Sequence, residues 1–192
     1  MGERGEGDRP ALSRAVFLDR DGVINRSWVR DGKPYAPTSL AEFEILPGAV
    51  EAIAALKKAG FRVIVVTNQP DVAAGRVSRA VVEAMDKRVR ETCRVDDVRV
   101  CYHAETEGCA CRKPKPGLLV DAARDWGVDL RRSYMVGDRW RDIGAGQAAG
   151  CRTVLIDYKY AEQQAENPDM VVTSLMEASQ RILSEVKRAV TQ

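Results

Sequence analysis

The chain has 192 residues, of which 45% are hydrophobic and 30% charged, as is typical of one globular domain with a buried core. Its 30 basic and 28 acidic side chains give a net charge of +2, too balanced to favour a nucleic-acid or membrane surface. No stretch reaches the roughly 18 apolar residues of a membrane-spanning helix, and the N-terminus lacks the apolar core of a signal peptide. We therefore expect a cytoplasmic protein, with a flexible tail at residues 1–14 and a single domain at 15–192.

Short apolar runs alternate with segments of helical periodicity along the chain. The runs predict strands at residues 15–18, 62–66, 98–102, 134–136, 153–156 and 170–172. The periodic segments predict helices at residues 47–60, from about 78, at 116–126, up to about 150, and from about 174. A loop-like stretch is expected over residues 25–40. This alternation is typical of an α/β domain whose mostly parallel sheet carries helices on both faces.

Two carboxylates, Asp19 and Asp21, follow the first predicted strand directly. Side chains two residues apart in an extended chain point to the same side, so both can face one reacting atom. Carboxylates this close repel each other unless a cation holds them, and Asp138 and Asp142 bring further carboxylate oxygen. Ligands made only of oxygen suit a hard cation such as Mg²⁺. The alternative is that the first two carboxylates merely cap a turn.

The second predicted strand ends in a hydroxyl and an amide, those of Thr67 and Asn68, which suit phosphate oxygens. Lys113 adds a fixed positive charge. Ligands of open α/β sheets bind beyond the carboxyl ends of the strands, where these groups are expected to meet the aspartates. The joint pattern predicts a phosphate site with a bound cation.

A cluster of soft ligands has the pattern C-x-H-x5-C-x-C, formed by Cys101, His103, Cys109 and Cys111. The histidine is the only one in the chain. Three thiolates and one imidazole match a closed, tetrahedral and therefore structural zinc site. The alternative is a chance cluster of reduced cysteines.

Four motifs in this order resemble those of the haloacid dehalogenase (HAD) superfamily: FLDRDG, VVTN, the lysine of RKPKPG, and VGDRWRD. The resemblance implies a Rossmann-like HAD fold in which Asp19 is the nucleophile that attacks phosphorus. Asp21 would protonate the leaving oxygen and then activate water. Thr67 and Asn68 would hold phosphate oxygens, and Lys113 would neutralise the developing charge.

The same resemblance implies that Mg²⁺ is bound by Asp19, the backbone carbonyl of Asp21, and Asp138. We expect Asp142 to support this site, either through a metal-bound water or by fixing the lysine. Arg139, next to the metal-binding aspartate, is a candidate for a further supporting role.

The cysteine-rich loop narrows the resemblance to the zinc-bearing, histidinol-phosphatase-related branch of HAD phosphatases. Within it, the D-glycero-D-manno-heptose 1,7-bisphosphate 7-phosphatases share the strings DRDG, TNQ, C-x-H, C-x-C-RKP and SYMVGD with this chain. Such enzymes lack a large cap domain, so short loops would shape the pocket. Arg112, beside a zinc ligand, is expected to bind the distal phosphate of a bisphosphate. The chain departs from these enzymes at Pro70-Asp71, where they usually have Ser-Gly.

The expected reaction is Mg²⁺-dependent hydrolysis of the C7 phosphate of that heptose bisphosphate through a phospho-aspartate, by a monomer with a structural Zn²⁺. The product would serve the synthesis of lipopolysaccharide or related glycoconjugates. One alternative is a histidinol phosphatase or another small sugar-phosphate phosphatase. A second is a catalytically silent, zinc-containing binding module, against which the intact aspartates and lysine argue. A polynucleotide 3′-phosphatase is a third, disfavoured because the chain has no basic run.

Overall fold

The computed structural model describes residues 12–191. Its centre is a six-stranded sheet in the order β5-β4-β1-β6-β7-β8, with every neighbouring pair parallel. The strands are β1 (Arg14–Leu18), β4 (Phe61–Asn68), β5 (Asp97–Cys101), β6 (Tyr134–Gly137), β7 (Arg152–Ile156) and β8 (Met170–Val172). The predicted mostly parallel sheet of an α/β domain is confirmed.

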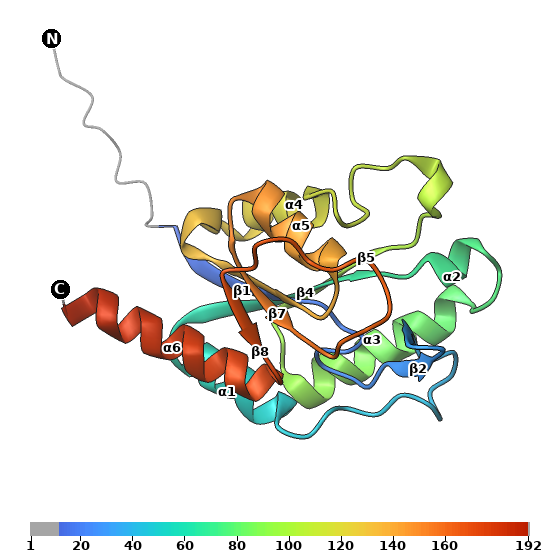
Figure 1. Ribbon diagram of the computed structural model, residues 1–192, viewed down its shortest axis with the longest axis horizontal. Helices are drawn as coiled ribbons and strands as arrows, with labels where there is room; N and C mark the ends of the chain where they lie inside the picture. Colours follow the sequence, from blue (N-terminus) through green and yellow to red (C-terminus); the bar gives the residue numbers. More distant parts are fainter. Residues whose placement is uncertain (1–11, 192) are drawn as a thin grey trace, which may run out of the picture.

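Helices cover both faces of this sheet (Figure 1). One layer contains α1 (Ala49–Lys58), α3 (Arg79–Cys93) and α6 (Leu175–Thr191), and the other contains α4 (Gly117–Trp126) and α5 (Trp140–Ala149). The alternation of side chains along β1 builds both cores. Val16 and Leu18 pack in the first, whereas Ala15 and Phe17 pack in the second. Full burial on both faces explains why this strand is apolar throughout.

The ends of several elements differ slightly from the prediction. Strand β1 begins at Arg14, and Ser13 forms an isolated bridge with Val128, so these two residues of the predicted tail belong to the fold. Residues 1–11 of that tail lie outside the described residues. Helix α1 begins at Ala49 rather than at the predicted proline, because Gly48 before it has the left-handed φ of 79° and caps the helix.

The predicted loop at residues 25–40 contains a two-stranded hairpin instead of irregular chain throughout. Strands β2 (Trp28–Arg30) and β3 (Lys33–Tyr35) pair antiparallel. Asp31 and Gly32 join them with φ values of 49° and 72°, as a two-residue type I′ turn requires. Short helical segments that were not predicted are α2 (Pro70–Ala73), η1 (Glu105–Glu107) and η2 (Leu130–Arg132).

Residues 12–191 contain no large cap domain, and none of their helices has the length and apolarity needed to cross a membrane. Strand β1 lies between β4 and β6 in the sheet. The residues at the carboxyl ends of these three strands therefore lie side by side, and the candidate site is built there.

Candidate active site and metal sites

Three buried carboxylates meet at the carboxyl ends of β1 and β6. Asp19 directly follows β1, and its backbone N–H donates to Val136 of β6 at 2.9 Å. Asp138 follows β6, and Asp142 lies in the first turn of α5. Each of the three offers an oxygen within 4.8 Å of the others. The structure thus brings together the aspartates that the sequence pattern predicted to meet.

Asp138 has the features of a metal ligand. Its Oδ1 is buried and has no hydrogen-bond partner among the described residues, while its Oδ2 accepts a hydrogen bond from Tyr160 at 3.0 Å. Burial, followed by the negative charges of Asp142 and Asp19, raises the pKa of Asp138 well above its usual range. A divalent cation would remove this penalty, so the donor set fits Mg²⁺.

Gly22 makes this arrangement possible. Its φ is +85°, and a Cβ at this position would lie 1.9 Å from Oδ2 of Asp138. Any other residue would displace the carboxylate or the turn that follows β1. The glycine of the DRDG string therefore allows both the turn after β1 and the close approach of the Asp138 carboxylate to the backbone.

Lys113 connects the carboxylates. Its Nζ lies 2.9 Å from Oδ1 of Asp19 and 2.5 Å from Oδ1 of Asp142, and donates to the carbonyl of Val66 at 2.8 Å. Burial alone would lower the pKa of Lys113, but the carboxylates of Asp142 and Asp19 raise it. Burial raises the pKa of Asp19 to about 6, and the charge of Lys113 opposes this rise. Asp142 also accepts from the backbone N–H of Arg139 at 3.1 Å, so it both fixes the lysine and caps α5.

Asp21 is held by residues that the sequence did not single out. Gln69 donates to its Oδ2 at 2.7 Å, and Asn25 donates to its Oδ1 at 2.9 Å. Arg20, whose side chain is fully buried, contacts Asp21 at 3.1 Å and Asp86 of α3 at 2.8 Å. The glutamine belongs to the TNQ string and could have been noticed, but nothing in the sequence marks the arginine as buried.

The two predicted phosphate-binding residues of β4 are placed differently from each other. Thr67 is buried, and its Oγ1 accepts from Gln69 at 2.9 Å. The side-chain amide of Asn68 donates to the carbonyl of Lys113 and accepts from its backbone N–H, both at 3.1 Å. Asn68 therefore fixes the segment that carries the lysine, and phosphate binding by either residue stays a prediction.

A cleft of about 290 Å³ opens over these groups. Its walls include Asp19, Asp21, Asn68, Lys113 and Asp142, together with residues of the β2–β3 hairpin. The cleft is also lined by Pro70 and Asp71, the two residues at which the chain departs from the related enzymes. Pro70 is the first residue of α2, and Asp71 is paired with Arg76.

The predicted arginines take different places around this cleft. Arg139 lines it, but its guanidinium is paired with Glu162 through both Nε and Nη2. Arg141 also lines the cleft, although the sequence did not mark it. Arg112 does not line it and instead faces an adjoining cavity.

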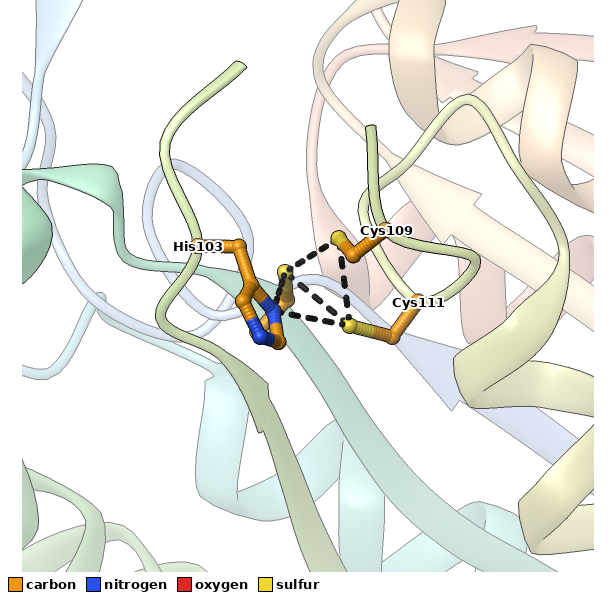
Figure 2. A group of neighbouring side chains, drawn as sticks. His103, Cys109 and Cys111 are labelled. Carbon is orange, nitrogen blue, oxygen red and sulfur yellow. Dashed lines mark hydrogen bonds between the residues drawn. The ribbon is translucent and has the colours of Figure 1, made fainter. Parts of the chain in front are cut away.

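The four soft ligands converge on one point. Cys101 Sγ lies 3.7 Å from the sulfur of Cys109 and 3.3 Å from that of Cys111. His103 Nδ1 lies 3.5 Å and 3.3 Å from the sulfurs of Cys101 and Cys111. Figure 2 shows the imidazole and the sulfurs turned toward one another. A tetrahedral zinc ion with Zn–S bonds of about 2.3 Å sets sulfurs about 3.8 Å apart, so the geometry is compatible with zinc.

A lysine that faces a buried aspartate, beside carboxylates that could hold a cation, is suited to phosphoryl transfer, and this is the class of reaction that the site fits. The family model of haloacid dehalogenase-like hydrolases matches residues 16–150. The chain belongs to this family.

Relatives of known name agree with this assignment. The D-glycero-beta-D-manno-heptose-1,7-bisphosphate 7-phosphatase of Pseudomonas aeruginosa is 42% identical over 151 residues, which cover 76% of this chain and 82% of the relative. The enzyme of the same name from Escherichia coli K12 is 35% identical, with 91% of this chain and 96% of the relative covered. The crystal structure of the D,D-heptose 1,7-bisphosphate phosphatase of B. bronchiseptica with magnesium and phosphate matches with a TM-score of 0.78 and 35% identity, covering 90% of this chain and 99% of that one. The chain is a phosphatase, as its motifs predict.

Proposed function

We propose that the chain hydrolyses the C7 phosphate of D-glycero-β-D-manno-heptose 1,7-bisphosphate, with Mg²⁺ as cofactor and Asp19 as the covalent nucleophile. The observation that carries this proposal is the Lys113 ammonium between Asp19 and Asp142, beside a buried oxygen of Asp138 that has no hydrogen-bond partner within residues 12–191. The names of relatives that are 35–42% identical support the substrate. The product would enter heptose biosynthesis.

In the first half-reaction, the carboxylate of Asp19 attacks phosphorus and the bond between phosphorus and the sugar oxygen breaks. Asp21 gives its proton to that leaving oxygen, and a phospho-aspartate results. In the second, Asp21 takes a proton from water as the water oxygen attacks phosphorus, which releases phosphate and restores Asp19. Lys113 offsets negative charge in both steps.

Asp19, the backbone carbonyl of Asp21, and Asp138 would hold Mg²⁺. When bound, the ion supplies positive charge that reduces repulsion between the nucleophile and the phosphate oxygens. The hydrogen bonds from Gln69 and Asn25 fix the position of the Asp21 carboxyl beside the nucleophile.

We further propose that Cys101, His103, Cys109 and Cys111 hold a structural Zn²⁺. The sulfur–sulfur and sulfur–nitrogen distances of 3.3–3.7 Å support this assignment. Cys111 lies two residues before Lys113, so a zinc ion would also fix the approach of the catalytic lysine. The cytoplasmic location and the monomeric state stay predictions.

The test is phosphate release by the purified protein with Mg²⁺ on both C1 anomers of the heptose bisphosphate and on histidinol phosphate. We expect the β anomer to have the highest kcat/KM, with turnover lost in Asp19→Asn. A preference for histidinol phosphate would refute the substrate while leaving the mechanism intact. Turnover retained in Asp19→Asn would refute the mechanism.

A further inference from the structure

A second cavity of about 230 Å³ adjoins the active cleft, because Lys113 and Arg141 line both. Arg112 and Glu105 form other parts of its wall. The cavity therefore presents two arginines to a ligand whose reacting phosphate lies at Lys113. The mechanism described above uses neither arginine.

One carboxylate in the wall of this cavity already pairs with Arg141. Glu105 accepts from Nη1 of Arg141 at 3.2 Å, and from Nη2 at 3.3 Å and 3.4 Å through its two oxygens. The guanidinium of Arg141 thus already holds one anionic group at this place.

The two side chains of this ion pair differ in their exposure to solvent and in the contacts that hold them. The side chain of Arg141 is 22% exposed and its guanidinium stacks 4.8 Å from the ring centroid of Trp140, whereas the side chain of Glu105 is 69% exposed. Arg112 has a buried Nε that bonds to no other group in the described part of the chain, and its Nη1 makes only a 3.4 Å contact with the carbonyl of His103. The cations are positioned by the fold, and the exposed carboxylate can move away from them.

Two other cationic side chains nearby are already bound to partners within the protein. Arg139 is paired with Glu162, whose side chain is 12% exposed. Lys115, also in the wall of the second cavity, donates to the carbonyls of Gly108 and Cys109 at 2.6 Å and 2.9 Å. Among residues 12–191, an incoming anion would compete with one exposed carboxylate, that of Glu105, at Arg141.

We propose that Arg141 binds the second phosphate of the substrate beside Arg112, to which the family resemblance already assigns that phosphate, and that Glu105 occupies Arg141 until the phosphate displaces it. The inference rests on the proposed function, which supplies a substrate with two phosphates. A guanidinium fork binds the oxygens of carboxylate and phosphate in the same geometry, and a phosphate dianion carries the larger charge. Arg141 is then a specificity residue that favours bisphosphates over monophosphates.

The test compares the bisphosphate with the same heptose carrying only the C7 phosphate. In Arg141→Gln we expect the ratio of the two kcat/KM values to fall about 10- to 100-fold, mainly through the KM of the bisphosphate, because a charge-assisted hydrogen bond is lost. Arg141→Lys should recover part of this loss, since it restores the charge without the fork. Glu105→Gln should lower the KM of the bisphosphate. Arg124→Gln, an exposed arginine paired with Asp121 and Asp125, is the matched control and should leave the ratio unchanged.

Equilibrium binding in an Asp19→Asn background separates this inference from the proposed reaction. We expect calorimetry to show tighter binding of the bisphosphate than of the monophosphate, and this difference should shrink when Arg141→Gln is added. Bisphosphate turnover by the wild type with an unchanged ratio in Arg141→Gln, or an increased KM in Glu105→Gln, would overturn the inference alone. Absence of wild-type turnover would overturn the proposed function, while the binding difference would still decide the role of Arg141.

Discussion

The ammonium of Lys113 lies 2.9 Å from a carboxylate oxygen of Asp19, and both side chains are buried. Because Asp142 flanks the same ammonium, one lysine compensates two buried negative charges. Replacing it by the uncharged Met, of similar length, should leave both uncompensated. We expect Lys113→Met to abolish turnover and to lower the free energy of unfolding by about 3–5 kcal/mol, the usual cost of removing one partner of a buried ion pair. Urea denaturation without metal measures this, and an unchanged midpoint would show that the pair does not stabilise the fold.

Gly22 should be required for Mg²⁺ binding. In Gly22→Ala, the new Cβ would collide with Asp138, and the positive φ would add about 1–2 kcal/mol of backbone strain. The matched control is Gly60→Ala, which has the same φ of +85° but no heavy atom within 4 Å of its added Cβ. Calorimetric titration with Mg²⁺ should show weakened binding in the first variant and normal binding in the second. Equal Mg²⁺ affinity in the two variants would mean that the space at Gly22 is not needed for Asp138 to bind the ion.

Loss of the proposed zinc ion should unfold the loop before Lys113. We expect Cys109→Ser to lower the zinc content below one ion per chain, the melting temperature, and the activity with saturating Mg²⁺. Cys93→Ala is the control, because Cys93 is buried in α3 away from the cluster, and it should retain the metal. Elemental analysis reports the zinc content. Full activity in a sample verified to be free of zinc would contradict this account.

The Arg20–Asp86 pair should position Asp21. Asp86→Asn removes one charge next to a fully buried guanidinium, and we expect a loss of about 1–3 kcal/mol in the free energy of unfolding together with a lower kcat. Asp121→Asn alters an exposed pair with Arg124 and should change stability by less than about 1 kcal/mol. Guanidinium denaturation distinguishes the two variants. Similar small changes in the free energy of unfolding of both variants would show that the buried pair stabilises the protein no more than the exposed pair does.

The strands and most of the site could be predicted because their signals are local. The apolar run before Asp19 is continuous since β1 is buried on both faces, and the motif residues follow strand ends directly. The β2–β3 hairpin was missed although Asp31-Gly32 marks its turn, because its strands are largely exposed and carry no apolar alternation. The order of the six strands had no local signal at all.

The positions of the arginines around the site could not be predicted in this way. Arg20 is fully buried, and one of its partners, Asp86, lies on a helix much later in the chain. Arg112, beside a predicted zinc ligand, lines the adjoining cavity, and its expected binding of a distal phosphate stays a prediction. Arg141 lines both that cavity and the cleft, and the sequence alone did not indicate this. Such placements depend on contacts between distant segments, which a single sequence does not reveal.

The central claim is that Asp19 carries the phosphoryl group during hydrolysis of the heptose bisphosphate. The most direct measurement is a rapid acid quench of enzyme with Mg²⁺ and this substrate, followed by mass spectrometry of the peptide that contains Asp19. We predict a phosphoryl group on Asp19 that forms before free phosphate accumulates and is absent in Asp19→Asn. Free phosphate released at the full rate, with no phosphorylated peptide at any quench time, would contradict the account.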